Sequence, residues 1–135
     1  MKTRRTLALV VLAYLPFAAL CVVLYLFSSM SHPAFPRFLI KVPHYDKLVH
    51  FCAFALMGIS SALAVGFRTK SLGAKTLLEA FLMAIVYGVI DEVHQSYVPF
   101  RDPSIPDLIA DALGAFFGAY LMLAAMTKKA PEWRY

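Results

Sequence analysis

Long uncharged apolar runs constrain this chain more than any other feature of its sequence. Residues 7–27 form a run of 21 residues without a charged side chain, and residues 48–67 and 108–126 form two further runs with one ionisable residue each. About 20 predominantly apolar residues in a helix span the hydrocarbon core of a bilayer, which is about 30 Å thick. The three runs therefore predict transmembrane helices and argue against a soluble domain.

A shorter apolar run lies between the second and third of these segments. Residues 80–90 are apolar over only 11 positions, and a run of that length is more typical of a re-entrant or interfacial segment. It becomes a full span only if residues 77–97 are helical, which would place Asp91, Glu92 and Gln95 near the far end of the helix.

Lysine and arginine are distributed unevenly between the two ends of the predicted helices. If the N-terminus is cytoplasmic, nine of them lie on the cytoplasmic side. The four on the outer side are Arg37, Lys41, Lys47 and Arg101. Cytoplasmic loops carry an excess of these residues, so the count favours an even number of spans. The sequence thus predicts a single domain, residues 1–135, folded as an all-α bundle of four transmembrane helices with both termini inside.

The composition argues against several other classes of protein. Hydrophobic residues make up 61% of the chain and charged residues 16%, compared with about 25% charged in soluble domains. The net charge of +5 comes from basic residues that flank the apolar runs, and no basic-groove motif suggests a nucleic-acid partner. The first run exceeds the roughly 7–15 apolar residues of a signal peptide, so a retained helix is expected. Cys21 and Cys52 lack metal-ligand spacing.

The two predicted outer connections are rich in proline. Six of the eight prolines lie there, namely Pro33, Pro36, Pro43, Pro99, Pro103 and Pro106. Proline fixes φ and stiffens a loop, and residues 32–45 also carry aromatic side chains. The prolines and aromatic residues of this segment predict that it lies on the membrane surface after the first helix. The stiff aromatic cap either shapes a site or is an aromatic belt with ordinary loops.

Polar residues gather at the outer ends of the second, third and fourth predicted helices. They are Asp46, Lys47, His50, Glu92, Gln95, Asp107 and Asp111, and Arg101 lies in the outer loop between the third and fourth helices. Residues four apart share a helix face, as Asp46 and His50 do. On the last helix, Gly114 and Gly118 form a small-xxx-small pair, which usually faces a neighbouring helix. Asp107 and Asp111 share that stripe, so both aspartates are expected to point into the bundle.

Charged groups within a bilayer usually have a function, because inserting one costs roughly 2.5–3.5 kcal/mol. A structural polar network is the alternative. Asp46 and Asp107 lie near predicted helix N-termini, where a carboxylate caps the helix or interacts favourably with the helix dipole.

In order and spacing, these residues resemble the VanZ-like family, a bacterial membrane family named for a protein linked to teicoplanin resistance. The resemblance covers residues 46–118 and consists of Asp46-Lys47-x-x-His50-Phe51, Glu92-x-x-Gln95, Arg101 with Asp107 six residues later, and Gly114 with Gly118. Where the family commonly has asparagine, this chain has Asp111, which could add a negative charge to the site. The resemblance implies the bacterial cytoplasmic membrane. It also implies a wider relationship to membrane enzymes that act on phosphate-linked lipid head groups, such as phosphatidylserine synthase-like proteins and toxins that cut cell-wall lipid precursors.

The first functional hypothesis is an enzyme that hydrolyses or transfers the head group of an envelope lipid or a lipid-linked cell-wall precursor at the outer face. Phosphoester chemistry needs a cation for the phosphate, a group that activates the nucleophile and an acid for the leaving group. His50 is the candidate base or nucleophile, oriented by Asp46, and Glu92 is its partner acid or base. Arg101 is the candidate phosphate clamp, with Gln95 and Lys47 also binding substrate. Asp107 and Asp111 could hold the histidine or the arginine, or bind a divalent cation.

Two further hypotheses use the same polar pocket. One is a non-catalytic protein that binds a lipid or a drug, and the other is a small transporter, for which four helices are few unless the chain oligomerises. The residues leave open the lipid, the reaction direction, the metal and the oligomeric state.

Overall fold

The computed structural model describes residues 2–31 and 35–129. Residues 1, 32–34 and 130–135 lie outside the described part, as do the side chains of residues 2–6, 37 and 39. The sequence features that fall outside the described residues are Pro33, Arg134 and the side chains of Lys2, Arg4, Arg5 and Arg37.

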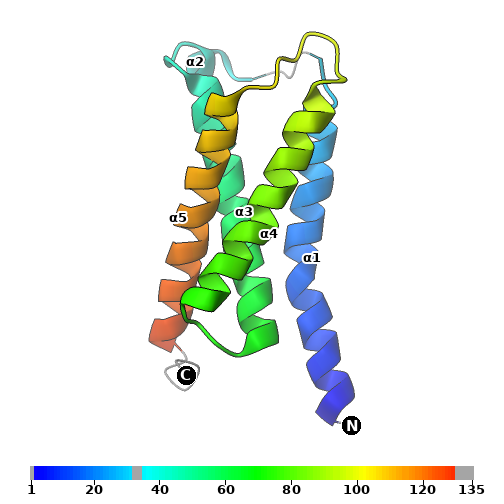
Figure 1. Cartoon of the computed structure of the whole chain (residues 1–135), viewed down its shortest axis with the longest axis vertical. Helices are drawn as coiled ribbons and strands as arrows, with labels where there is room; N and C mark the ends of the chain where they lie inside the picture. The colour runs from blue at the N-terminus through cyan, green and yellow to red at the C-terminus, as the bar shows by residue number, and fades with distance from the viewer. Residues whose placement is uncertain (1, 32–34, 130–135) are drawn as a thin grey trace.

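The described ranges contain five helices and no strand. The helices are α1 (Lys2–Ser28), α2 (Arg37–Ile40), α3 (Tyr45–Thr69), α4 (Ala74–Gln95) and α5 (Ile105–Lys129). Figure 1 shows the four long helices running along the long axis of the molecule, with the short α2 at the end where α1 finishes. The start of α1 and the end of α5 lie at the opposite end (Figure 1). The expected all-α fold is confirmed.

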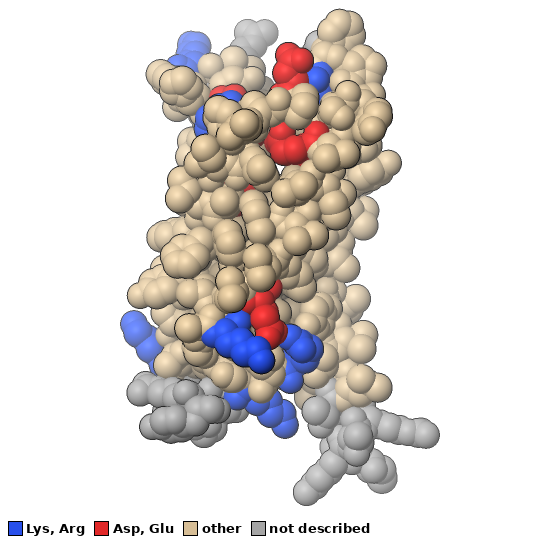
Figure 2. All heavy atoms as spheres, viewed as in Figure 1, with Lys and Arg blue, Asp and Glu red and all other residues tan. Residues whose placement is uncertain are grey.

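Three of the long helices are long and apolar enough to cross a membrane. They are α1 from Leu7 to Ser28, α3 and α5. α4 has 22 residues and is helical through the short apolar run, but it carries Lys75 and Glu79 near its start and Asp91 and Glu92 near its end. These features support a multi-pass membrane protein. Figure 2 shows more of the Lys and Arg atoms at the lower end of the visible face than at the upper end, and most of the Asp and Glu atoms at the upper end.

Small residues allow α3 and α5 to pack backbone against backbone. A Cβ atom added to Gly118 would lie 1.9 Å from the carbonyl oxygen of Ala55, and one added to Gly114 would lie 2.2 Å from that of Phe51. Glycine is therefore required at both positions for this approach. The prediction that Gly114 and Gly118 face a neighbouring helix is confirmed, and that helix is α3.

α1 packs less tightly than the other long helices. Its Phe17, Leu20 and Leu24 pack against the buried cluster that contains Phe54 and Met57. Its remaining large apolar side chains are mostly exposed, as expected for a helix that faces lipid. Space is left between α1 and α3, and the polar residues identified in the sequence lie at one end of it.

Candidate functional site

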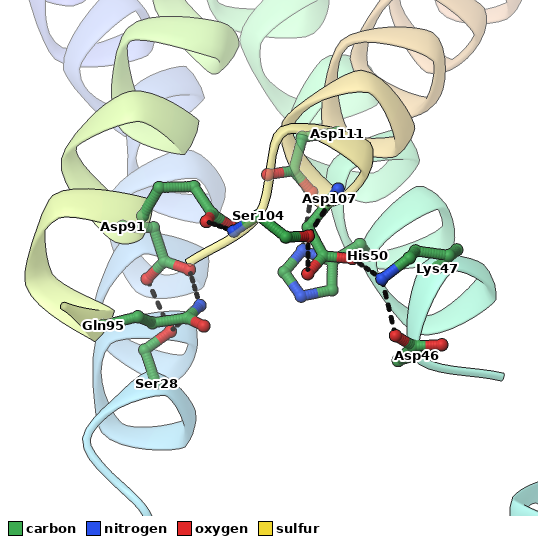
Figure 3. A network of polar contacts seen from close by, with 10 residues as sticks. Ser28, Asp46, Lys47, His50, Asp91, Gln95, Ser104, Asp107 and Asp111 are labelled. Atoms are coloured by element: carbon green, nitrogen blue, oxygen red, sulfur yellow. Dashed lines mark hydrogen bonds and ion pairs between the residues drawn. The ribbon is translucent and has the colours of Figure 1, made fainter. Parts of the chain in front are cut away.

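Three helix ends and one connection bring the predicted site residues to the same end of the bundle. The first two turns of α3 carry Asp46, Lys47 and His50, and the first two turns of α5 carry Asp107 and Asp111. Glu92 and Gln95 lie in the last turn of α4, and Arg101 lies in the α4–α5 connection. Figure 3 shows Gln95 beside Asp91 on one side of the view and a cluster that contains His50 and Asp107 on the other. Among the described residues, Arg101 bonds to neither group.

His50 is held by Asp111. The distance from His50 Nδ1 to Asp111 Oδ1 is 2.9 Å, and Asp111 is completely buried. α4 passes close to this pair at Gly88, where an added Cβ atom would lie 3.0 Å from Phe54 Cε1 and 3.4 Å from Asp111 Oδ2. An ionised Asp111 carboxylate can only accept a hydrogen bond, so it would place a proton on Nδ1, and a neutral ring would then have its lone pair on Nε2.

The residue that holds His50 differs from the one first expected. The helical spacing favoured Asp46, but the carboxylate of Asp46 instead lies 2.6 Å from Lys47 Nζ. Lys47 Nζ also lies 2.7 Å from Asp107 Oδ1, so the lysine joins the start of α3 to the start of α5. The second suggestion, that Asp107 or Asp111 holds the histidine, is confirmed for Asp111.

Ser104 organises the start of α5. Its hydroxyl donates to Asp107 Oδ2 over 2.6 Å and accepts from the Asp107 amide over 3.2 Å. Its own amide donates to Glu92 Oε2 over 2.9 Å. Ser104 was not among the site residues predicted from the sequence. The signal was a serine followed three residues later by an acidic residue at the start of a helix, which is a capping pattern.

Several oxygen atoms in this cluster have no hydrogen-bond partner among the described residues. They include Glu92 Oε1 and Asp111 Oδ2, both buried. One potential ligand atom from each of His50, Glu92 and Asp107 lies within 4.8 Å of the other two. The arrangement combines an oriented imidazole with carboxylates that have unused acceptor capacity. Such a group can bind a cation or take part in proton transfer.

A second group of polar residues ties α4 to α1. Ser28 Oγ donates to Asp91 Oδ1 over 2.5 Å, and Gln95 Nε2 donates to Asp91 Oδ2 over 2.8 Å (Figure 3). Beside them, His94 Nε2 lies 3.0 Å from Ser29 Oγ. Gln95 therefore belongs to the group around Asp91 and is bonded away from Glu92.

Arg101 binds the end of α1. Its Nε donates to the carbonyl of Met30 over 3.0 Å, and a terminal nitrogen donates to that of Phe27 over 3.1 Å. The sequence left open that Asp107 or Asp111 holds the guanidinium, but the described hydrogen bonds of Arg101 go to backbone carbonyls instead. A cation is favourable at a helix C-terminus, where carbonyl groups lack partners.

A cavity of about 570 Å³ lies between α1 and α3 and reaches both polar groups. Its apolar wall includes Leu20, Leu24 and Leu56, and its polar end includes His50 and Arg101. Asp46, Asp91 and Gln95 also line that end. A cavity with one long apolar wall and one polar end is suited to an amphipathic molecule.

The family model VanZ-LLP1, described as VanZ/LLP1, matches residues 3–126. No curated protein and no solved structure gives a match. The matched range includes the whole polar cluster and extends the resemblance seen in residues 46–118 to the first helix.

Proposed function

The chain belongs to the VanZ/LLP1 family, and on this premise we propose that it is an enzyme of the bacterial cytoplasmic membrane that acts on lipids. It hydrolyses or transfers the phosphate-linked head group of an envelope lipid or a lipid-linked cell-wall precursor. The observation that carries the proposal is the pairing of His50 with the buried Asp111, at the polar end of an amphipathic cavity.

The residues support a division of labour at the polar end of the cavity and in the cluster beside it. His50 Nε2 carries the lone pair that accepts a proton from the attacking nucleophile or attacks phosphorus itself. Glu92, held by the Ser104 amide, is the partner acid or base. Arg101 uses two of its five N–H donors in its described bonds, and the others bind phosphate. Asp46 and Lys47 stabilise the helix starts beside the head group.

This function is tested by incubating the purified protein in vesicles that contain phospholipids or polyprenyl-phosphate-linked lipids. Release of a water-soluble head group, with formation of the corresponding lipid product, is the expected result. If no lipid in either class yields a product, the enzymatic proposal is contradicted.

A non-catalytic lipid or drug binder is the second candidate. It is favoured by the engagement of Lys47 and Gln95 in contacts within the protein, which leaves the cavity with few free polar groups. Binding of a lipid without any product would support this candidate.

We further propose that all four long helices cross the membrane, with both termini cytoplasmic and the polar cluster at the outer side. The lysine and arginine distribution supports this topology. Cysteines introduced at the exposed Lys75 and Asp102, in a background with Cys21→Ala and Cys52→Ala, are expected to react from opposite sides of intact cells. An impermeant maleimide should label only Asp102→Cys. Labelling of both positions from outside contradicts the topology.

Arg101→Lys is expected to lower turnover by about 10-fold or more, because lysine keeps the charge but loses the planar fork that reaches two acceptors at once. Lys75→Ala, at the other end of the bundle, removes one of several orientation-setting charges and is expected to retain turnover. Both variants are compared with wild type at matched protein level. Wild-type turnover in Arg101→Lys would show that the fork is not needed.

A further inference from the structure

Buried negative charge surrounds His50 at the junction of α3, α4 and α5. Asp111 is fully buried, and Glu92 and Asp107 are each only 8% exposed. Among the described lysine and arginine side chains, Lys47 contacts one of these three carboxylates, that of Asp107. Lys47 also contacts Asp46. With all three carboxylates ionised and His50 neutral, one shared lysine leaves the cluster short of positive charge, and buried charges in proteins are usually paired or coordinate metals.

Two side chains of the cluster each have an atom that is available to bind a metal ion. Glu92 is fixed through Oε2 by the Ser104 amide, which leaves the buried Oε1 without a hydrogen-bond partner. His50 is fixed through Nδ1 by Asp111, which leaves Nε2 as the ring atom able to bind a metal. A histidine that binds a metal almost always donates its other N–H to a carboxylate, a carbonyl or water, and Asp111 fills that role here.

We propose that His50, Glu92 and Asp107 bind one divalent metal ion at the polar end of the cavity. One potential ligand atom of each residue lies within 4.8 Å of the other two. Bonds of about 2.0–2.2 Å place ligand atoms roughly 3.5 Å apart, so side-chain movements on the order of 1 Å would close the site around an ion. Asp107 would meet the metal beside Lys47, which already contacts its Oδ1. Asp111 is a positioning residue that orients His50.

The ligand set indicates the class of metal. One imidazole and two carboxylates suit a transition-metal ion such as Zn²⁺ or Mn²⁺, whereas Ca²⁺ takes six to eight oxygen ligands and Mg²⁺ retains several waters. Three protein ligands leave a coordination position for a further oxygen ligand, and His50 lines the cavity through which it would enter. The identity of the substrate in this inference rests on the proposed function. A bound metal ion changes the role of His50, because the Nε2 lone pair then binds the metal instead of a proton.

The test uses the full chain in detergent, stripped with a chelator and dialysed against Zn²⁺ or Mn²⁺ alone. The expected result is one ion per wild-type chain by mass spectrometry of the metal. Glu92→Gln and Asp107→Asn should each lower the affinity at least about 100-fold, and Asp111→Asn about 10- to 100-fold. Asp91→Asn is the matched control, because Asp91 is a buried carboxylate whose oxygens are bonded to Ser28 and Gln95, and it should keep wild-type affinity.

Unfolding of the stripped variants separates loss of a ligand from loss of the fold. Glu92→Gln removes one charge from the cluster, so the metal-free variant should be at least as stable as metal-free wild type while gaining no stability from Zn²⁺ or Mn²⁺. Less than half an ion per wild-type chain, or wild-type affinity in both ligand variants, overturns the metal site. Metal binding is measured without lipid, so stoichiometric binding without head-group release supports the site and overturns the enzymatic function. Head-group release by protein that binds no metal supports the enzymatic function and overturns the metal site.

Discussion

Glu92→Gln is expected to reduce head-group turnover by about 10²- to 10⁴-fold, the usual contribution of a positioned acid or base. The substitution keeps the size of the side chain and an oxygen that can accept from the Ser104 amide. It removes the negative charge and the ability to exchange a proton. Turnover is measured with the lipid that wild type converts, and lipid binding is measured in parallel.

Lipid binding should change only a few-fold in this variant, because the apolar wall of the cavity is formed by other residues, such as Leu20 and Leu24. Glu79→Gln is a suitable control, since Glu79 pairs with Arg68 at the other end of the bundle, and it should retain turnover. Equal turnover in wild type and Glu92→Gln would contradict a catalytic role for Glu92. Loss of binding together with turnover would indicate that Glu92 mainly supports the fold.

Gly118→Ala is expected to destabilise the bundle by about 3 kcal/mol or more, at the upper end of the range for overpacked cores. The added Cβ would lie 1.9 Å from the carbonyl oxygen of Ala55 and 2.7 Å from its carbon. Those atoms belong to backbone and cannot rotate away, so α3 and α5 would have to move apart. The stability is measured by thermal unfolding of the detergent-solubilised protein.

Gly73→Ala is the matched control for this substitution. Gly73 precedes α4 with φ −87°, and the nearest atom to an added Cβ is the Ser71 hydroxyl at 3.9 Å. An alanine there fits the backbone and meets only an ordinary contact, so its unfolding temperature should stay near that of wild type. If Gly118→Ala unfolds at the same temperature as Gly73→Ala, the close contact between α3 and α5 is not required for the fold.

The sequence predicted the helices because each apolar run had to satisfy its own backbone hydrogen bonds in an apolar medium. α4 was the least certain element, since only 11 of its residues form an uncharged run. It is helical over Ala74–Gln95, so its charged ends lie on the same helix as its apolar middle. The glycine pair was also predictive, because small residues four apart on a helix mark a close contact.

The contacts within the polar cluster were harder to predict. Spacing along one helix places Asp46 and His50 on the same face, but the partner of His50 comes from α5 and depends on how α3 and α5 pack. Arg101 lies in a connection without helical periodicity, so the sequence could not show that it reaches the end of α1. Ser104 was detectable in principle from its capping pattern, although its bond to Glu92 depends on the position of α4.

The most direct test of the central claim compares head-group turnover in wild type, His50→Gln and His94→Gln, reconstituted at equal density in vesicles of the convertible lipid. Both histidines lie near the same end of the bundle, but His50 is held by Asp111 and lines the cavity, whereas His94 contacts Ser29 outside the carboxylate cluster. The account predicts that His50→Gln loses at least about 100-fold in turnover, while His94→Gln stays within a few-fold of wild type. Turnover in His50→Gln equal to that of wild type would contradict the claim that the cluster around His50 is a catalytic site.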